Sequence, residues 1–439
     1  MATTVGALLA FGVAVSAYGC WREPALPISA APDPRPVVTD VTQLSRIAMS
    51  QVVAPRTLDE LSAAVRSHPG PISVGGGRYS MGGQTATPGG LQIDMRAFRG
   101  VVAFDRAAKT ITVRAGTRWR EVQEAVDRAG LAVKIMQTYN TFTVGGSLGV
   151  NAHGRYVGHG PLVGSVREIV LVLADGSVVR ASRTERPELF WGAVGGYGAL
   201  GVVAEVTLDL ADNVRVRRSD VTMPIAEYGK WFRANVRANP RAVFHNADIY
   251  PDDYDRVNAV TYAETSDPVT IPARLHPPEQ GSALKRGAVA VITGAPGGKW
   301  LRQHVVDPAL FAAEPVTWRN YEASYDVSEL EPASRERTTY VLQEYFIPVD
   351  SFDVFVPRMR KVLREHRVNA LNVSIRHALP DTGTLLAWAP TEVFAFVLYY
   401  RQATDPSSRH ADNRARTARA WRAAGTAGTT APRSPAPRR

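Results

Sequence analysis

Short strand-like and helix-like patterns alternate along the central part of the chain. Residues 57–67 place Leu58, Leu61 and Val65 on one stripe, which predicts a short amphipathic helix. A Pro-Gly break and a strand over residues 71–74 follow, and this order is typical of a β-α-β opening. The same patterns predict a second helix over residues 119–129 and strands over residues 91–95, 101–105, 110–115, 166–174, 178–181 and 202–210.

The pattern changes near residues 212–219, after which aromatic residues and prolines become denser, so we place a domain boundary there. Beyond it, residues 352–367 read as an amphipathic helix between strands at residues 340–348 and 370–377, and residues 394–400 read as a third strand. The chain shows no repeat of 20 to 50 residues, which argues against solenoids and propellers. Its 36 glycines and 30 prolines indicate many turns rather than a helical bundle.

Composition indicates a folded chain of 439 residues, of which 45% are hydrophobic and 21% charged. Such a chain can bury a core, and its length suggests two or three domains. Cys20 is the only cysteine, which excludes an intrachain disulfide and a cysteine zinc site. We predict no metal site.

The basic charge is concentrated at the C-terminal end. Residues 403–439 contain eight arginines and two aspartates, so they carry +6 of the net +10. They also lack the apolar residues that a packed core needs, and we predict a disordered basic tail that is possibly non-native. Because only one aromatic residue, Trp421, lies among these arginines, we predict no nucleic-acid partner.

The N-terminal end is apolar instead. Residues 1–21 carry no charged side chain, which predicts a signal peptide or membrane anchor over residues 1–23 and a membrane-associated or exported protein. No basic residue precedes the apolar run, so a cytoplasmic location also stays open. Residues 24–40 are rich in proline and read as a linker.

Glycine-rich segments are the most informative motifs. The first, residues 74–84, follows a short strand and can form a nest of backbone N–H groups for phosphate oxygens. A Rossmann fingerprint fails because Ser80 stands at the third glycine and the following glycines and proline forbid a helix. A P-loop fails because no Gly-Lys-Ser/Thr follows. Two further glycine-rich segments, residues 143–154 and 192–207, would let a flat ligand approach the backbone closely.

These three segments, in this order and spacing, resemble the FAD-binding domain of the vanillyl-alcohol oxidase superfamily, also called the p-cresol methylhydroxylase type (PCMH-type). In detail they are similar to its alditol, D-arabinono-1,4-lactone and L-gulonolactone oxidase branch. The resemblance implies an α+β fold. Two subdomains, residues 41–213, would enclose FAD, and a cap domain with an antiparallel sheet, residues 214–402, would bind the substrate. Because nothing after Gln402 resembles the end of such a cap, we expect the cap to be incomplete and the native C-terminus to be lost.

The resemblance also implies the cofactor site. The first glycine segment would hold the pyrophosphate, residues 143–149 would line the adenine and ribose side, residues 151–154 would approach the flavin, and Val203 would contact FAD through its backbone. The implied FAD-binding residues are Gly75, Gly76, Gly77, Arg78, Tyr79, Ser80, Met81, Gly82, Gln84, Thr143, Gly145, Gly146, Ser147, Gly149, Asn151, His153, Gly154 and Val203.

Two positions depart from the family pattern. Tyr79 stands where many members carry a histidine bonded to the flavin, so we predict noncovalent FAD. In the cap, members carry Glu-x-Arg at the flavin face, and this chain has Ser374, Ile375 and Arg376 there. The resemblance implies that Arg376 stabilises reduced flavin or the substrate alkoxide.

The general base stays open among His377, Glu344 and His153. Because strand side chains alternate, Ser374 and Arg376 should share one face and His377 should lie on the other.

The implied function is an FAD-dependent oxidoreductase that oxidises the CH–OH group of a sugar lactone, polyol or related alcohol. Oxygen or a membrane electron carrier would accept the electrons. The departures at Tyr79 and Ser374 support one alternative, a flavin-binding protein with degenerate or lost catalytic activity.

Overall fold

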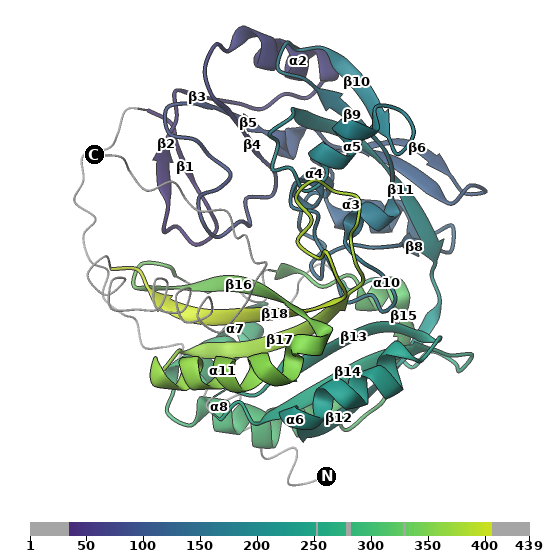
Figure 1. Ribbon diagram of the computed structural model, residues 1–439, viewed down its shortest axis with the longest axis vertical. Helices are drawn as coiled ribbons and strands as arrows, with labels where there is room; N and C mark the ends of the chain where they lie inside the picture. The colour runs from purple at the N-terminus through teal and green to yellow at the C-terminus, as the bar shows by residue number, and fades with distance from the viewer. Residues whose placement is uncertain (1–34, 252, 278–281, 328–330, 333, 406–439) are drawn as a thin grey trace.

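The computed structural model describes residues 35–405 except residues 252, 278–281, 328–330 and 333. Two parts lie one above the other in Figure 1, and they are named here the N-terminal half, residues 35–213, and the C-terminal half, residues 214–405.

The N-terminal half contains most of the short elements. Its strands are β1 (Val37–Thr39), β2 (Arg46–Ala48), β3 (Gln51–Val53), β4 (Ile72–Gly75), β5 (Leu91–Asp94), β6 (Val101–Asp105), β7 (Thr110–Arg114), β8 (Leu131–Val133), β9 (Val166–Val172), β10 (Val178–Ser182) and β11 (Val202–Asp212). Its helices are α2 (Leu58–Ser67), α3 (Trp119–Asp127), α4 (Val144–Gly149) and α5 (Pro187–Ala193).

These strands form three sheets. β1 and β2 pair with each other, β3-β5-β4 is a parallel sheet, and β10-β9-β11-β7-β6 is an antiparallel sheet to which β8 adds by pairing with β11. The apolar stripe of α2 explains its position, because Leu61 and Val65 are buried in one core with Ile93 of the parallel sheet. Trp119 and Val122 of α3 are fully buried in the second core.

The C-terminal half is built on one large sheet. Its strands are β12 (Arg215–Pro224), β13 (Ala242–Ile249), β14 (Arg256–Glu264), β15 (Val316–Trp318), β16 (Thr338–Pro348), β17 (Ala370–Ala378) and β18 (Val393–Ala403). Its helices are α6 (Ile225–Phe232), α7 (Ser282–Gly294), α8 (Gly298–Leu301), α9 (Asp307–Phe311), α10 (Arg319–Glu322) and α11 (Phe352–Glu365). The strands pair antiparallel in the order β15-β12-β14-β13-β17-β18-β16. The predicted α+β class with an antiparallel sheet in the second half is therefore confirmed.

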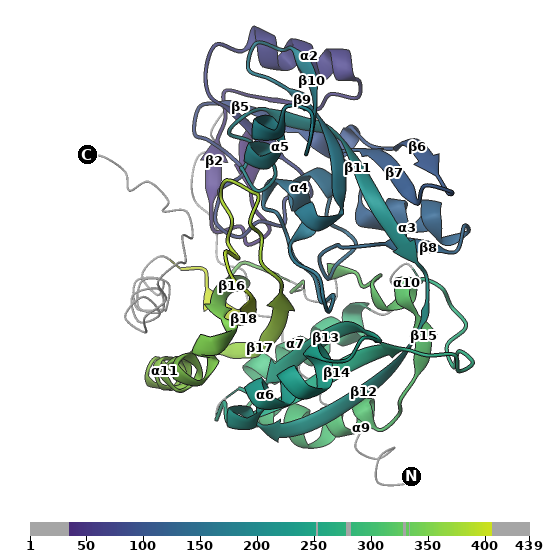
Figure 2. The ribbon, with the colours of Figure 1, turned by 45° about the vertical axis from the view of Figure 1, so that its right-hand side comes forward.

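The two faces of this sheet have different neighbours. Residues such as Ile375 and Phe396 point toward α6 and α11 and share a core with Phe352. Alternate residues on the other face, such as Phe244 and Val260, belong to the core of the N-terminal half. Figures 1 and 2 show this layering, with α6 and α11 on the side of the sheet away from the N-terminal half. The face that meets the N-terminal half can thus contribute to a shared site.

The predicted membrane association or export is wrong as far as the structure describes the chain. Within the described part of residues 35–405, no helix is both long and apolar enough to cross a membrane. The apolar segment behind that prediction, residues 1–23, lies outside the described residues. So do most of the predicted linker and residues 406–439 of the predicted basic tail.

Candidate functional site

The first two glycine-rich segments pack directly against each other. A Cβ atom at Gly76 would lie 2.4 Å from Oγ1 of Thr143 and 3.5 Å from Cα of Gly146. A Cβ atom at Gly146 would lie 2.9 Å from the same hydroxyl oxygen. Since such distances exclude a side chain, glycine at position 76 allows the close approach of the two segments, and glycine at position 146 leaves room for the Thr143 hydroxyl.

The first segment also leaves backbone donors available. Within the described residues, the N–H groups of Gly77, Ser80 and Gly82 find no protein acceptor. Arg78 has a φ of 64°, a left-handed conformation that turns successive N–H groups toward one side. Donors of this kind suit the oxygens of a diphosphate, so the residues present fit the pyrophosphate of FAD.

Other predicted cofactor residues already bond within the protein. Thr143 is the N-cap of α4, and its hydroxyl accepts from the N–H of Gly146 at 3.3 Å. The hydroxyl of buried Ser147 accepts from Nε1 of Trp119 at 2.8 Å and donates to the carbonyl of Thr143. These contacts fix the second segment, and through it the position of the backbone beside Gly76.

The remaining predicted cofactor residues lie around these segments. Met81 packs against Leu342 and contacts its backbone N–H through sulfur at 3.1 Å, so the first segment touches strand β16. A Cβ atom at Gly154 would lie 2.1 Å from the carbonyl oxygen of Met136. Val203 stands at a register irregularity between β11 and β9. Of the other predicted cofactor residues, Gly75 is buried, Gly145 and Gly149 are half-buried, and Gln84 is exposed.

Tyr79 occupies a packed position. Its ring meets Phe142 edge-on with centroids 4.7 Å apart. Burial raises the pKa of its phenol, and the charge of Arg118 opposes part of that change. The hydroxyl is therefore neutral near pH 7.

Asn151 and a long loop of the C-terminal half hold the two halves together. The side-chain amide of Asn151 donates to Oδ2 of Asp381 at 2.9 Å, and the backbone carbonyl of Asn151 accepts from Nε1 of Trp388 at 2.9 Å. Both partners lie in the β17–β18 loop, residues 379–392, which reaches up to α4 and α5 (Figure 2). Within this loop, a Cβ atom at Gly383 would lie 2.3 Å from the ring of Trp191. The loop thus packs tightly against the N-terminal half.

Register places Glu344, Ser374 and Arg376 on one face of the large sheet. Glu344 of β16 pairs with Val397 of β18, and Val397 pairs in turn with Ser374 of β17. Arg376 lies two residues from Ser374 and therefore points to the same side. This is the face that meets the N-terminal half.

His153 of the second glycine segment meets Glu344 on that face. Its Nε2 atom lies 3.3 Å from Oε2 of Glu344, and its Nδ1 atom lies 3.3 Å from the carbonyl oxygen of Gly154. A carbonyl and a carboxylate both accept, so each ring nitrogen of His153 faces an acceptor oxygen. The rings of Phe346 and Trp388 flank His153, with centroids 5.8 and 5.1 Å away.

The charge of Glu344 is affected by two neighbours, His153 and Arg376. Burial alone would raise the pKa of Glu344, but the hydrogen bond and charge of His153, together with the charge of Arg376, hold it below the ordinary value. Burial lowers the pKa of Arg376, although the charges of Glu344 and Tyr139 act to raise it. Among the described residues, Nε of Arg376 has no hydrogen-bond partner although it is buried. A buried guanidinium N–H without a partner is uncommon in folded proteins and marks this position as unusual.

His377 lies on the opposite face, as the strand alternation predicts. Its Nε2 atom lies 2.6 Å from Oε1 of Glu392, and its ring packs 5.0 Å from Phe232 of α6. Burial lowers the pKa of His377, which Glu392 partly offsets. The structure therefore brings together Glu344, His153, Ser374 and Arg376, and it separates His377 from them.

Sequence reasoning missed three aromatic residues near this cluster. Trp388 and Phe346 flank His153, and Tyr139 lies close enough to Arg376 to affect its pKa. Phe346 could have been found, because it lies two residues from Glu344 in a predicted strand and so shares its face. Trp388 and Tyr139 lie in loops that carry no periodic signal.

Comparison with known proteins is consistent with this arrangement. The family model described as FAD binding domain matches residues 49–182. Alditol oxidase from a Streptomyces species is 38% identical over 162 residues, which cover 36% of this chain and 38% of that protein. L-gulonolactone oxidase of Mus musculus is 32% identical over 149 residues, or 34% of each chain. Cytokinin dehydrogenase 6 of Oryza sativa is 31% identical over 185 residues, covering 39% of this chain and 35% of that protein.

Similarity in three dimensions extends further. Cholesterol oxidase from Brevibacterium sterolicum superposes with a TM-score of 0.61 at 15% identity, covering 86% of this chain and 82% of that structure. This likeness concerns the fold. The sequence matches span between 34% and 38% of the three relatives' own lengths.

Residues 49–182 thus match an FAD-binding domain, and the chain is similar to PCMH-type FAD oxidoreductases, which confirms the resemblance and FAD as the cofactor. Its relatives include an alditol oxidase, a putative D-arabinono-1,4-lactone oxidase of Neurospora crassa and an L-gulonolactone oxidase.

Proposed function

We propose that this protein is an FAD-dependent oxidoreductase that oxidises the CH–OH group of a polyol, a sugar lactone or a related alcohol. The observation that carries the proposal is the cluster of Glu344, His153 and Arg376. It lies where the antiparallel sheet meets the second glycine segment. Alditol and lactone oxidases among the relatives support this substrate class.

The cluster can accept the proton that such an oxidation releases. Oxidation of CH–OH to a carbonyl removes a hydride from carbon and a proton from oxygen; bound FAD supplies the hydride acceptor. Glu344 is ionised near pH 7 because its pKa is lowered, so its carboxylate can take the hydroxyl proton. His153 holds the carboxylate in place through its Nε2 atom.

Arg376 supplies positive charge beside the base. The charge of its guanidinium can stabilise the substrate oxygen as negative charge develops there. Phe346 and Trp388 form an apolar wall against His153, which limits the access of water. Ser374 is buried on the same face.

We further propose that FAD is bound without a covalent link through Tyr79, because a neutral, packed phenol is a poor nucleophile. Relatives named oxidases support oxygen as the electron acceptor. The predicted membrane electron carrier finds no support in the part of the chain that the structure describes.

Flavin bleaching under anaerobic conditions tests this function. Purified protein would be loaded with FAD, mixed with a panel of alditols and 1,4-lactones, and followed by absorption. Bleaching by at least one member, with recovery on admitting oxygen, is the expected result.

Retained flavin that no member of the panel bleaches would favour the alternative, a flavin-binding protein without catalytic activity. Acid precipitation of the same sample tests the linkage: yellow supernatant means noncovalent FAD, and a yellow pellet means a covalent bond.

A further inference from the structure

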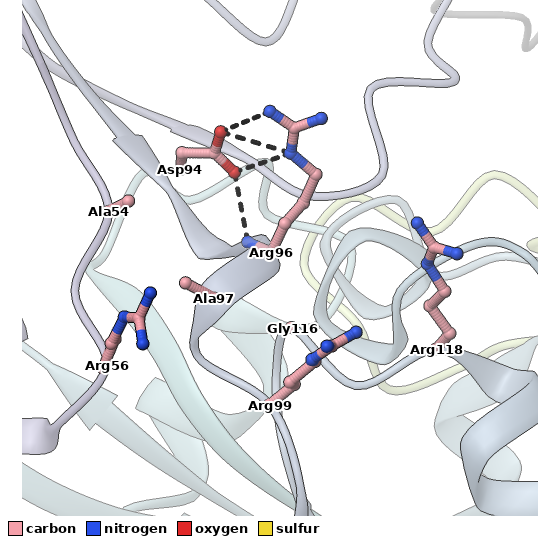
Figure 3. A pocket seen from close by; sticks show the side chains of 8 residues that line it. All are labelled: Ala54, Arg56, Asp94, Arg96, Ala97, Arg99, Gly116 and Arg118. Carbon is pink, nitrogen blue, oxygen red and sulfur yellow. Dashed lines mark hydrogen bonds and ion pairs between the residues drawn. The ribbon is translucent and has the colours of Figure 1, made fainter.

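A second cluster of charged side chains lies outside the candidate active site, in the N-terminal half. Four arginines, Arg56, Arg96, Arg99 and Arg118, line a hollow of about 480 Å³ together with Asp94. The remainder of its wall consists of two alanines and a glycine. Figure 3 shows the four guanidinium groups around this space. It is called here the arginine pocket.

Positive charge in the pocket is only partly compensated. Asp94 accepts from Nη2 of Arg96 at 2.6 Å and from Nη2 of Arg78 at 2.9 Å, so two guanidiniums share one carboxylate. Arg99 has a single long contact, 3.8 Å, with Glu121. For Arg56 and Arg118, no carboxylate lies within ion-pairing distance in the described part of the chain. The pocket therefore presents at least two guanidiniums that no protein anion neutralises.

Asp94 does not cancel the attraction of the pocket for anions. It is 11% exposed, and both of its oxygens are engaged by arginine side chains. Its role is to position Arg96, whose N–H and guanidinium both bond to it. The free fork of a guanidinium matches the geometry of a phosphate-type oxyanion, which can accept two parallel hydrogen bonds.

The pocket adjoins the cradle assigned to FAD, because Arg118 forms a bridge with Thr143, but the two share no lining residue. None of residues 75–84 and none of residues 143–154 lines it. Arg78 belongs to the first glycine segment and reaches Asp94 without forming part of the pocket wall. The volume falls in the range of small-molecule sites.

We propose that the arginine pocket binds a phosphate-type anion carried by a small molecule, at a site separate from the FAD diphosphate. Arg56 and Arg118 supply the uncompensated charge, and Arg96, fixed by Asp94, supplies an oriented donor. Such a site lets a phosphorylated ligand bind to the FAD-loaded protein.

Calorimetry on the FAD-loaded protein tests this inference, with inorganic pyrophosphate and inorganic phosphate as probes at low salt. We expect saturable binding with one site per chain that weakens as the salt concentration rises. In the double variant Arg56→Gln/Arg118→Gln, the affinity should fall at least tenfold.

The matched control is Arg106→Gln/Arg128→Gln, which removes the same charge from two exposed arginines outside the pocket. Arg128 lies at the other end of the helix that Arg118 precedes. The control should keep its affinity within about twofold. Equal losses in both double variants would show unspecific charge attraction and overturn the proposal.

Two further outcomes would also overturn it. The first is the absence of saturable binding to the FAD-loaded protein. The second is binding to the FAD-free protein only, together with a tenfold loss of FAD affinity in the Arg56/Arg118 variant; it would assign these arginines to the FAD diphosphate. The FAD content of every sample, read from its absorption, separates these outcomes from a failure of the proposed redox activity.

Discussion

Replacing Glu344 by glutamine tests the proposed base most directly. Glutamine keeps the size of the side chain and an oxygen that can accept from His153, but it cannot take a proton. General bases contribute about 100- to 10,000-fold to a rate, equivalent to about 3–5 kcal/mol of activation free energy. We expect the rate of anaerobic flavin reduction to decrease by a factor in that range. In this variant Arg376 also loses the negative charge of Glu344, which balances its own charge.

The pH dependence gives a second readout. Because the pKa of Glu344 lies below its ordinary value of 4.5, the wild-type rate should be constant on the basic side and fall only as the pH drops through that lowered pKa. This acidic limb should disappear in Glu344→Gln. A structural role alone would not remove it.

The chain offers a matched control in Glu392→Gln. Glu392 pairs with His377 at 2.6 Å on the helix-covered side of the same sheet, so this change alters another His–Glu pair away from the site. Flavin reduction in the control should stay within about threefold of the wild type. The reasoning is refuted if Glu344→Gln reduces flavin within threefold of the wild-type rate and retains the acidic limb.

Three further predictions concern the cation, the cofactor loop and stability. Arg376→Lys should lower kcat about 10- to 1,000-fold because an ammonium at a buried site cannot reproduce the guanidinium donors, and steady-state kinetics with the best substrate would check it. Gly76→Ala should reduce the ratio of FAD to purified protein, because its Cβ would lie 2.4 Å from Oγ1 of Thr143; a ratio equal to the wild type would contradict the packing argument. Burial lowers the pKa of His245, which bonds to Tyr228 and Thr261, to about 3. The unfolded chain protonates this residue near 6.5 and the folded one does not, so stability should decrease as the pH falls, by about 2 kcal/mol between pH 7 and 5. Urea unfolding at both pH values would measure this, and His245→Gln should show a correspondingly smaller loss.

Strongly periodic segments were predictable from the sequence. Helices α2 and α3 begin and end within two residues of their predicted bounds, because each has an apolar stripe that a core must cover. Helix α4 was not predicted, since glycines in its six residues lower the helix propensity. It forms because Thr143 caps it locally and Trp119 bonds to Ser147. The second of these contacts depends on the tertiary fold.

The candidate site also has one part that the sequence predicts and another part that it does not. Alternation along one strand separated Arg376 from His377 correctly, since both residues lie in β17 and strand geometry decides their faces. The pairing of His153 with Glu344 joins residues 191 positions apart. No local pattern could show it, because it follows from the packing of the two halves. The β17–β18 loop brings Trp388 to the same place by contacts with Asn151 and Trp191.

Sheet register also bears on the serine at position 374. Ser374, Val397 and Glu344 form one row across three strands, so a carboxylate is still present on this face, two strands away from the serine. A buried guanidinium requires a nearby negative charge, and Glu344 is the carboxylate that raises the pKa of Arg376 most. Because His153 holds the same carboxylate from the other half, the charge of Arg376 is balanced without an acidic residue at 374. Compared with the family pattern, serine at position 374 thus leaves one carboxylate fewer on the sheet face that meets the N-terminal half. Glu344 still supplies a negative charge for Arg376 and a proton acceptor on this face.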